Sequence, residues 1–469
     1  MAIITPILVI FLVVVIFNII IFVHELGHFL AARWRGLEVE RFQIWFGKPI
    51  WKKTYNGVQY GLGWIPFGGF VALPQMVTME AIEGDNMIDK PLPPAKPLDK
   101  IIVAFAGPLF SFLLAFATAF IVWGVGKPDT RLTQTTIGYV EKDSAAEKAG
   151  LKPGDEIVSI GSNKIDSWAG NMDTGVVESI ATSEGDKIQI VVNRPGVAEP
   201  VTLNSGYKIE DTSWYKRAAM RKIGISYKEQ VIVGRVLENS PAAEAGLQED
   251  DLILTFKGQP ALSRMQLIKA AEAGEPTPIT VKRGSEELSM TLVPRKPMAP
   301  NDDKTAFGVG FKFDESLVSD QIVHPGPWRQ IVDSALVMKK TIQLVTSSES
   351  SIGVDQLAGP VGIGKGYFDM LTSSSNGWKL ALGFTVLFNI NLAILNMLPF
   401  PVLDGGHITL SLLEIIAGRP VKARVLEVIQ TGFVFLIFGL FLYITSKDVG
   451  AFVPGGKKEP QEMKFEPSQ

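Results

Sequence analysis

The chain has 469 residues, too many for one compact core, and its charge is nearly balanced, with 45 Lys and Arg against 48 Asp and Glu. Apolar residues make up 46% of the chain and charged residues only 20%, which is a low share of charge for a soluble protein. The formal charge of −3 argues against nucleic-acid binding, because it leaves no basic excess to contact phosphates. The absence of cysteine excludes disulfide frameworks, Cys-ligated metals and thiol nucleophiles.

Four stretches without a charged side chain are long enough to cross a bilayer, which takes about 20 helical residues. They cover residues 1–23, 101–126, 380–403 and 428–446. The first has no Lys or Arg ahead of its apolar run and no small-residue cleavage site, so we interpret it as a span and not as a cleaved signal peptide. Basic residues are concentrated between the first two spans and between the last two. The positive-inside rule therefore places these connections in the cytoplasm and both termini on the opposite face.

The region between the second and third spans carries a duplicated pattern, displaced by 96 positions (246 minus 150). In each copy a strand-like segment precedes Ala-Gly-Leu, an acidic residue and another strand-like segment. The matching residues are Ile137-Gly138-Tyr139-Val140, Ala149-Gly150-Leu151, Asp155 and Ile157 in the first copy, and Val233-Gly234-Arg235-Val236, Ala245-Gly246-Leu247, Asp251 and Ile253 in the second. Two copies indicate two similar domains, because a solenoid needs more and shorter units.

This duplicated pattern resembles bacterial PDZ domains. The resemblance implies domains that bind an extended peptide as an added strand. The loop that holds the peptide carboxylate in that family best matches Ile223, Gly224 and Ile225, ahead of the second copy, and has no good counterpart ahead of the first. Two spacer domains that occlude a membrane site without binding anything are the alternative.

The sequence His24-Glu25-Leu26-Gly27-His28 follows the first apolar stretch and has the spacing of a metal site. Positions i and i+4 of a helix share a face, so both imidazoles can reach one cation. Glu25 lies beside that face, where it can take a proton from a water that the metal activates. Two hydrogen-bonded surface histidines are the alternative. We favour a catalytic metal, because such residues in hydrocarbon without a function would be costly.

The best candidate for a third ligand is Asp404, at the end of the third apolar stretch. Pro399, Pro401 and the following Gly pair would unwind the helix and direct this carboxylate toward a cation. His407 is the competing ligand, although it could equally bond to backbone groups freed by the unwinding. Two His and one carboxylate suit a single catalytic Zn²⁺ with an open position for water.

The combination of these motifs resembles the site-2 protease family, most closely its bacterial sigma-E-activating branch with two PDZ domains. The residues that carry the likeness are HELGH at 24–28, LDGG at 403–406, Arg41-Phe42, Phe46-Gly47-Lys48, Gly68-Gly69-Phe70-Val71 and Ala106-Gly107-Pro108. The resemblance implies a multi-pass protein of the bacterial inner membrane, in contact with lipid, whose termini and PDZ domains are periplasmic. It also implies zinc-dependent cleavage, within the membrane helix, of single-span substrates already trimmed on their periplasmic side, such as an anti-sigma factor or a signal-peptide remnant, in a regulated stress response. On the family's pattern His24, His28 and Asp404 match the zinc ligands, and Glu25 matches the general base.

A scissile bond inside a membrane helix imposes one further requirement, because the substrate must be unwound and held extended. Residues 60–73 have strand-like residues broken by Gly and Pro, which predicts a hairpin whose edge could pair with the substrate. The residues that we assign to substrate contact are Gly68, Gly69, Phe70, Val71, Asn391 and Asn396. An ordinary cytoplasmic hairpin, and asparagines that only bridge helices, are the alternatives.

The expected fold is a multi-span α-helical membrane protein with four transmembrane helices, a membrane-associated β-hairpin and two periplasmic PDZ-like α/β domains. The expected parts are the first span with HELGH (1–35), the loop with the hairpin (36–97), the second span (98–126), the PDZ-like domains (127–222 and 223–312), amphipathic surface helices (325–376), the third span with LDGG (377–407), the fourth span (425–446) and a disordered tail (447–469).

Two functions of other classes compete with proteolysis. A membrane chaperone with PDZ peptide-binding modules would hold its substrate without cleavage and would use His407 to close a structural four-ligand metal site. A metal-ion transporter would need polar residues along a path through the membrane, which residues 101–126 and 428–446 do not provide.

Overall fold

The computed structural model describes the chain apart from residues 1–3, 77–91, 300–303, 420–422, 451–462 and 467–469. The chain forms two compact units. The helical unit comprises Met1–Pro128, Ile322–Gln343 and Leu357–Val449, and the sheet-rich unit comprises Asp129–Gln321, Leu344–Gln356 and Gly450–Gln469.

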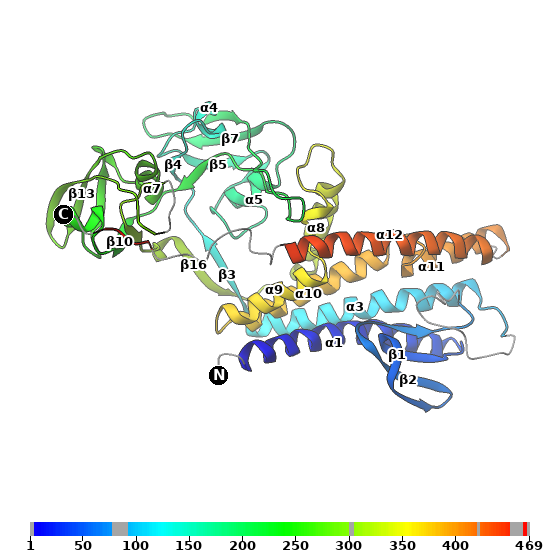
Figure 1. Cartoon of the computed structure of the whole chain (residues 1–469). Helices are drawn as coiled ribbons and strands as arrows, with labels where there is room; N and C mark the ends of the chain where they lie inside the picture. The colour runs from blue at the N-terminus through cyan, green and yellow to red at the C-terminus, as the bar shows by residue number, and fades with distance from the viewer. Residues whose placement is uncertain (1–3, 77–91, 300–303, 420–422, 451–462, 467–469) are drawn as a thin grey trace. The chain divides into compact units, whose positions relative to one another are not determined.

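Four helices of the described chain are long and apolar enough to cross a membrane. They are α1 (Ile4–Trp34), α3 (Pro97–Val125), α10 (Gly377–Asn396) and α12 (Ala423–Gly450). Helix α3 contacts both α1 and α10, and Figure 1 shows these helices running side by side. Few side chains in the apolar parts of α1 and α12 are buried, as is expected of surfaces that face lipid.

Helix α3 packs against α10 through small side chains. It begins at Pro97, directly after the N-cap Lys96. Proline is well suited to this position, because an N–H there would have no acceptor within the helix. Ala115 and Ala119 are fully buried in a cluster that includes Ile390 of α10. Small residues let helix backbones approach closely, and such packing holds helices together where lipid is as apolar as the interface.

The third apolar stretch is shorter as a helix than the predicted span over residues 380–403. Helix α10 ends at Asn396. Pro399 and Pro401 lack a backbone N–H and disfavour the helical conformation of the residue before them, so the helix cannot continue. A separate helix, α11 (Asp404–Ala417), then begins at the predicted metal ligand, which the hydropathy pattern does not predict.

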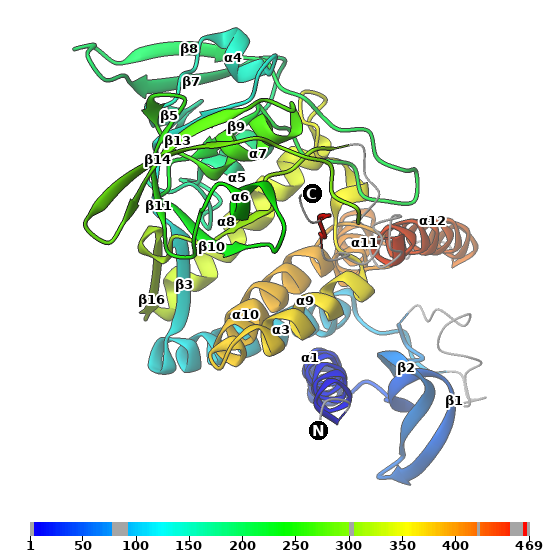
Figure 2. The ribbon, with the colours of Figure 1, turned by 60° about the vertical axis from the view of Figure 1, so that its left-hand side comes forward.

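Strands β1 (Arg41–Tyr55) and β2 (Val58–Ala72) form a long antiparallel hairpin beside α1 (Figure 2). Its turn is Asn56-Gly57, where both residues have positive φ (48° and 80°), as a type I′ turn requires. The prediction of a hairpin within residues 60–73 is wrong about the turn. Nearly all of these residues belong to one strand, whose partner precedes it in the sequence.

The start of β1 lies between the two ends of β2. Arg41 pairs with Gln59 on one side and with Ala72 on the other, so β2 bends back across β1. The last part of β2, residues 69–72, therefore forms an edge, and no other described strand pairs with its outer side. A buried apolar cluster that joins α1, the hairpin and α3 holds this edge in place.

Two further helices occupy residues 325–376, where amphipathic surface helices are predicted. They are α8 (Pro327–Thr346) and α9 (Pro360–Ser373). Helix α9 is fixed within the helical unit, because Tyr367 is fully buried and its hydroxyl lies 3.0 Å from Thr385 Oγ1 of α10. Asp448 of α12 also accepts a hydrogen bond of 2.7 Å from the N–H of Gly362, in the first turn of α9.

The sheet-rich unit contains two halves with the same succession of strands. The first half has β4 (Ile137–Val140), α4 (Ala145–Ala149), β5 (Glu156–Ile160), β6 (Asn163–Lys164), α5 (Val176–Ala181), β7 (Ile188–Asn193), β8 (Val201–Ser205) and β9 (Ile225–Tyr227). The second has β10 (Val231–Val236), α6 (Pro241–Glu244), β11 (Leu252–Phe256), β12 (Gln259–Pro260), α7 (Arg264–Glu272), β13 (Thr277–Arg283), β14 (Glu286–Leu292) and β15 (Val309–Phe311). The remaining elements are β3 (Lys127–Leu132), η1 (Glu315–Leu317), β16 (Val318–Val323) and η2 (Val354–Gln356).

The pairing of these strands matches between the halves except that β10 pairs with β11, whereas β4 and β5 belong to separate sheets. In the first half β9 pairs with β4, and β6, β5, β7 and β8 form a sheet in that order. In the second half the sheet runs β15, β10, β11, β13, β14, with β12 on β11. The duplicated sequence therefore corresponds to a duplicated strand arrangement.

The repeated aspartates are structural. Asp155 accepts hydrogen bonds of 2.8 Å from Arg194, whose guanidinium also donates to Gly150 O at 2.7 Å. In the second half Asp251 accepts bonds of 2.7 Å from Arg283, whose guanidinium donates to Gly246 O at 2.7 Å. Each pair thus fixes the Ala-Gly-Leu turn to the sheet, which explains why the acidic residue recurs at the same spacing.

The predicted boundary between the two domains, at residue 223, is wrong. Strand β9 follows Ile223-Gly224 and pairs with β4, so this loop closes the first half and does not open the second. The Glu141 N–H donates to Gly224 O, just as the Leu237 N–H donates to Gly308 O in the second half. The two loop glycines are 84 positions apart (308 minus 224), so a search at the 96-residue spacing misses the correspondence.

Two described parts of the predicted disordered tail, 447–450 and 463–466, are ordered, whereas residues 451–462 and 467–469 of that prediction lie outside the described residues. Helix α12 continues to Gly450, and Lys464 forms an antiparallel bridge with Ala299. Phe465 is 4% exposed, so the burial of an aromatic ring stabilises a segment that composition alone assigns to disorder.

Replacing Asp251 with Asn should weaken the second half in a pH-dependent way. The hydrogen bond from Arg283 lowers the pKa of Asp251 below its ordinary value, although burial acts in the opposite direction. A carboxylate with a lowered folded-state pKa stabilises fully above its unfolded pKa of about 4, and this contribution disappears as the pH falls through the folded pKa. We expect amides of β10 and β11 to exchange at least about tenfold faster in Asp251→Asn at pH 7, and the difference from wild type to vanish in acid.

The exposed pair Lys312 and Asp250 supplies the control, because breaking it with Lys312→Met should leave exchange in β10 and β11 unchanged. A pH-independent effect of Asp251→Asn would contradict this account.

Candidate metal centre

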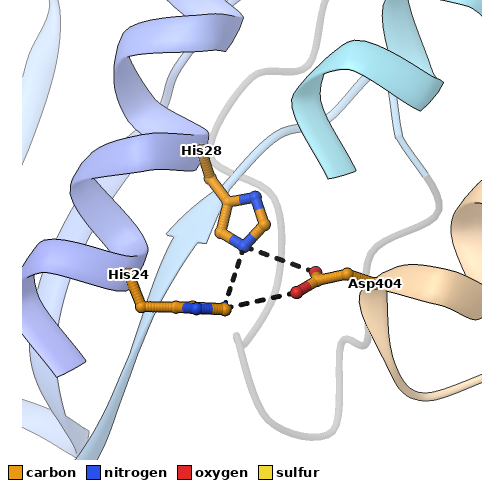
Figure 3. Close-up of side chains that lie close together, drawn as sticks. All are labelled: His24, His28 and Asp404. Atoms are coloured by element: carbon orange, nitrogen blue, oxygen red, sulfur yellow. Dashed lines mark hydrogen bonds and ion pairs between the residues drawn. The ribbon is translucent and has the colours of Figure 1, made fainter. Parts of the chain in front are cut away.

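Three side chains that are far apart in the sequence meet in the helical unit. His24 and His28 project from α1, and Asp404 is the first residue of α11 (Figure 3). The two imidazole Nε2 atoms are 3.3 Å apart. Asp404 Oδ2 lies 3.3 Å from His24 Nε2, and Asp404 Oδ1 lies 3.3 Å from His28 Nε2. The three predicted ligands therefore converge in a triangle whose third corner is the Asp404 carboxylate, with each imidazole facing a different oxygen of that carboxylate.

The size of this triangle fits a zinc ion. Tetrahedral ligands at Zn–N and Zn–O distances of about 2.0–2.1 Å are separated from one another by about 3.3–3.4 Å, the edge of the tetrahedron. The separation of 3.3 Å between the two Nε2 atoms matches this edge, and each Nε2 lies the same distance from its nearer oxygen of Asp404. Three protein ligands leave the fourth tetrahedral position open, as in catalytic zinc sites.

The outer ring nitrogens set the protonation needed for metal binding. His28 Nδ1 lies 2.8 Å from Val103 O of α3. Because a carbonyl oxygen can only accept, Nδ1 carries the proton, and the Nε2 lone pair is left for a cation. His24 Nδ1 lies 3.0 Å from Ser111 Oγ, which can accept in the same way. Lone pairs and a carboxylate at these distances repel one another unless a proton or a metal ion lies between them.

Two glycines make this arrangement possible. An added Cβ at Gly27 of α1 would overlap the Ala106 carbonyl of α3. A Cβ at Gly107 would overlap His28 Nε2 and would lie 2.9 Å from His24 Nε2. The backbone of α3 therefore supports the imidazoles directly. This contact gives a physical role to the Ala106-Gly107-Pro108 motif, which in the sequence only carries a family resemblance.

Helix α11 is held against α3, which fixes the direction of Asp404. Lys100 Nζ of α3 lies 3.0 Å from Glu414 Oε2 of α11, and both side chains are largely buried. Gly405 and Gly406 lie so close to the preceding turn that a Cβ would overlap the carbonyls of Met397 and Phe400. The Gly pair of LDGG therefore allows the chain to fold back tightly before the helix starts.

Glu25 lies next to the centre and near the hairpin edge. It makes no hydrogen bond or ion pair with another described residue, so its carboxylate is available as a base. A Cβ built at Gly69 of β2 would be 3.4 Å from Glu25 Cγ and 3.1 Å from Ile21 Cγ2. The edge strand thus passes beside the predicted general base, and a side chain at Gly69 would reduce the space there.

His407 is not part of the group. Among the residues that the structure describes, the cluster of potential metal ligands consists of His24, His28 and Asp404. The closed four-ligand site expected of a structural metal is therefore not formed by the described residues. This arrangement favours the open, catalytic type of centre over the structural one.

The predicted substrate residues lie on the hairpin and on α10. Phe70 and Val71 are 8% and 9% exposed, so β2 can offer a partner its backbone but hardly these side chains. Asn391 Oδ1 is buried without a hydrogen-bond partner. Asn396 is the last residue of α10 and is half-buried. These positions remain predicted contacts.

The predicted PDZ peptide contacts lie in the first half of the sheet-rich unit. Ile223, Gly224 and Ile225 line a groove of about 1040 Å³, together with Val176 and Ile180 of α5. Gly224 has φ +86°, and a Cβ there would lie 2.5 Å from the Cβ of Ser144, so the loop requires glycine. Peptide binding in this groove remains a prediction.

Replacing Gly107 with Ala should displace the imidazoles and prevent zinc binding. We expect the zinc content of the purified protein after dialysis to fall at least about tenfold, measured by atomic absorption per mole of chain. Gly124→Ala is the matched control on the same helix, because a Cβ there meets nothing within 4 Å. Equal zinc in the two variants would show that the α1–α3 approach does not shape the centre.

Comparison with known proteins agrees with this geometry. The sequence profile of peptidase family M50 matches residues 12–440. A putative zinc metalloprotease of Vibrio cholerae is 30% identical over 442 residues, covering 88% of this chain and 92% of the relative. The regulator of sigma-E protease RseP of Escherichia coli is 27% identical over 466 residues, covering 92% and 96%. The regulator of sigma E protease of Haemophilus influenzae is 29% identical over 432 residues, covering 87% and 90%.

A solved PDZ domain, from an SdrC-like protein of Listeria monocytogenes, aligns with 20% of this chain and 97% of its own length at 21% identity. Its TM-score of 0.17 is too low to establish a shared fold. The family assignment rests instead on a profile that matches nearly the whole chain, and the converging His, His and Asp side chains agree with it. The chain belongs to peptidase family M50, the site-2 protease family, and is a metalloprotease of that type.

Proposed function

We propose that this chain is a zinc-dependent intramembrane endopeptidase that cleaves single-span membrane proteins within their membrane helix. The observation that carries the proposal is the triangle of His24, His28 and Asp404, which lies among helices apolar enough to cross a membrane. A zinc site in such surroundings is suited to peptide bonds that enter from the bilayer and not from water.

The residues of the centre have separate roles. His24, His28 and Asp404 would hold one zinc ion, which when bound lowers the pKa of a water ligand and polarises a peptide carbonyl. Glu25 takes the proton from the attacking water and returns it to the leaving amine. Val103 O and Ser111 Oγ keep the imidazoles in the tautomer that binds a cation.

The substrate would bind as an added strand on residues 69–72. This segment has a free edge, passes beside Glu25 and offers mainly backbone groups. Such pairing tolerates different side chains, which suits an enzyme that must hold unwound membrane helices. The buried Asn391 Oδ1 has no hydrogen-bond partner in the described structure and can accept from a freed substrate N–H.

The relatives that are named for sigma-E regulation suggest the biological setting. We infer that the substrates include a membrane-bound anti-sigma factor after a first cut on its periplasmic side, and signal-peptide remnants. The charge distribution of the connecting loops supports a location in the inner membrane, with the termini and the sheet-rich unit in the periplasm. The matching halves of that unit would act as two PDZ-like domains.

Glu25→Gln should abolish cleavage while zinc binding is retained. The amide cannot accept the proton, so we expect a loss of at least about 100-fold, whereas the ligand triangle is unchanged. Asp404→Asn should lower both zinc content and cleavage, because it removes a charged ligand. The measurement is fragment formation from a tagged single-span protein together with zinc analysis of purified enzyme. Glu38→Gln, at an exposed acid, is the matched control; full activity of Glu25→Gln would refute the mechanism.

Substrate contact with the hairpin edge can be mapped in the inactive Glu25→Gln protein. A photo-crosslinking residue placed within the span of the substrate should attach to residues 69–72, because added-strand pairing brings the two backbones about 4.8 Å apart. Mass spectrometry of the crosslinked peptide identifies the site. Attachment to the far end of the hairpin, residues 51–57, would instead indicate an ordinary cytoplasmic hairpin.

A further inference from the structure

The C-terminal segment Met463–Glu466 docks onto the second half of the sheet-rich unit. The Met298 N–H donates to Lys464 O at 2.7 Å, and the Lys464 N–H donates to Ala299 O at 2.9 Å. This pair of bonds forms an antiparallel bridge between the two segments. The contact joins parts of the chain that are more than 160 positions apart (464 minus 299), so it is tertiary and not local.

Phe465 packs against the backbone of Gly308 and holds the segment in place. The ring is 4% exposed, and its Cε2 would be only 2.7 Å from a Cβ built at Gly308. The Arg295 guanidinium lies 5.9 Å from the ring centroid, donates to Glu466 O at 3.3 Å and pairs with Glu244 at 2.9 Å. The second half therefore contacts the segment in three ways: through the Phe465 ring, through the Glu466 carbonyl and through the backbone bridge at Lys464.

The docked segment also borders the main groove of this half. Met463 forms part of the wall of a groove of about 490 Å³, between Leu267 of α7 and Val309 of β15. The corresponding groove of the first half, beside Gly224, has no described residue of the C-terminal segment in its lining. The two halves are thus alike in strand order but differ in what lies against the loop glycine.

We propose that the segment Met463–Glu466 is an internal ligand of the second half, with Phe465 as its anchor. The second half is thereby specific for an extended segment with an aromatic residue, and its own C-terminal segment is the occupant. Because the ligand is tethered, it binds at a high effective concentration and outcompetes a free peptide of similar affinity. This inference is independent of the proteolytic mechanism.

Amide exchange of the full chain tests the docking. Met298 should exchange at least about tenfold faster in Phe465→Ala and in a chain ending at residue 462, because its acceptor is lost. Lys464→Ala is the matched control, since Lys464 is exposed and contributes only backbone bonds, and it should leave Met298 unchanged. Equal exchange of Met298 in wild type and in the shortened chain would overturn the proposal.

Peptide binding supplies the second test. A fluorescent peptide of residues 460–469, titrated with detergent-solubilised protein, should bind the shortened chain and full-length Phe465→Ala at least about tenfold more tightly than wild type. The peptide with Ala in place of Phe465 should not bind. Equal binding to wild type and both variants, or binding to none of them, would overturn the proposal, as would affinity that is unaffected by Arg295→Ala.

Discussion

The close approach of α1 to α3 is the constraint on which the centre depends. Gly27 faces the Ala106 carbonyl, and Gly107 faces the two imidazoles, so neither position has room for a side chain. Because the helices meet at this short distance, the α3 backbone reaches His28 and the Ser111 hydroxyl reaches His24. One packing contact thus orients both histidines and selects the tautomer that binds a cation.

The surroundings of this contact determine the charge that the centre can carry. Asp404 and Glu25 bring two carboxylates among apolar helices, where uncompensated charges are costly. Their two negative charges balance the double positive charge of a zinc ion, while the histidines remain neutral ligands. The Lys100–Glu414 pair between α3 and α11 is internally balanced and adds no net charge. Electrostatics therefore favours the same occupant as the distances between the ligand atoms.

The sequence predicts the centre better than the surrounding fold. A helical repeat fixes His24 and His28 on one face, and an acid after a proline-broken apolar stretch identifies Asp404, so the three ligands follow from local chemistry. Sequence reasoning does not find Ser111 or Val103 as partners of the histidines, because a serine and a backbone carbonyl in a span carry no such signal. The break at Pro399 and Pro401 is predicted, but helix α11 after it is missed, because its 14 residues are too few to be recognised as a membrane span.

The two halves of the sheet-rich unit share a scaffold but differ in what covers the loop glycine. The pairs Asp155–Arg194 and Asp251–Arg283 make the two halves look equivalent in sequence and in sheet order. The loops at Gly224 and Gly308 are also alike. Gly224 packs on Ser144, the N-cap of α4, and Gly308 packs on Ser240, the N-cap of α6. Only the second loop is covered by Phe465, a residue outside the repeat altogether. Equivalent scaffolds can therefore differ in what they bind because a distant segment, and not the repeated residues, determines access to one of them.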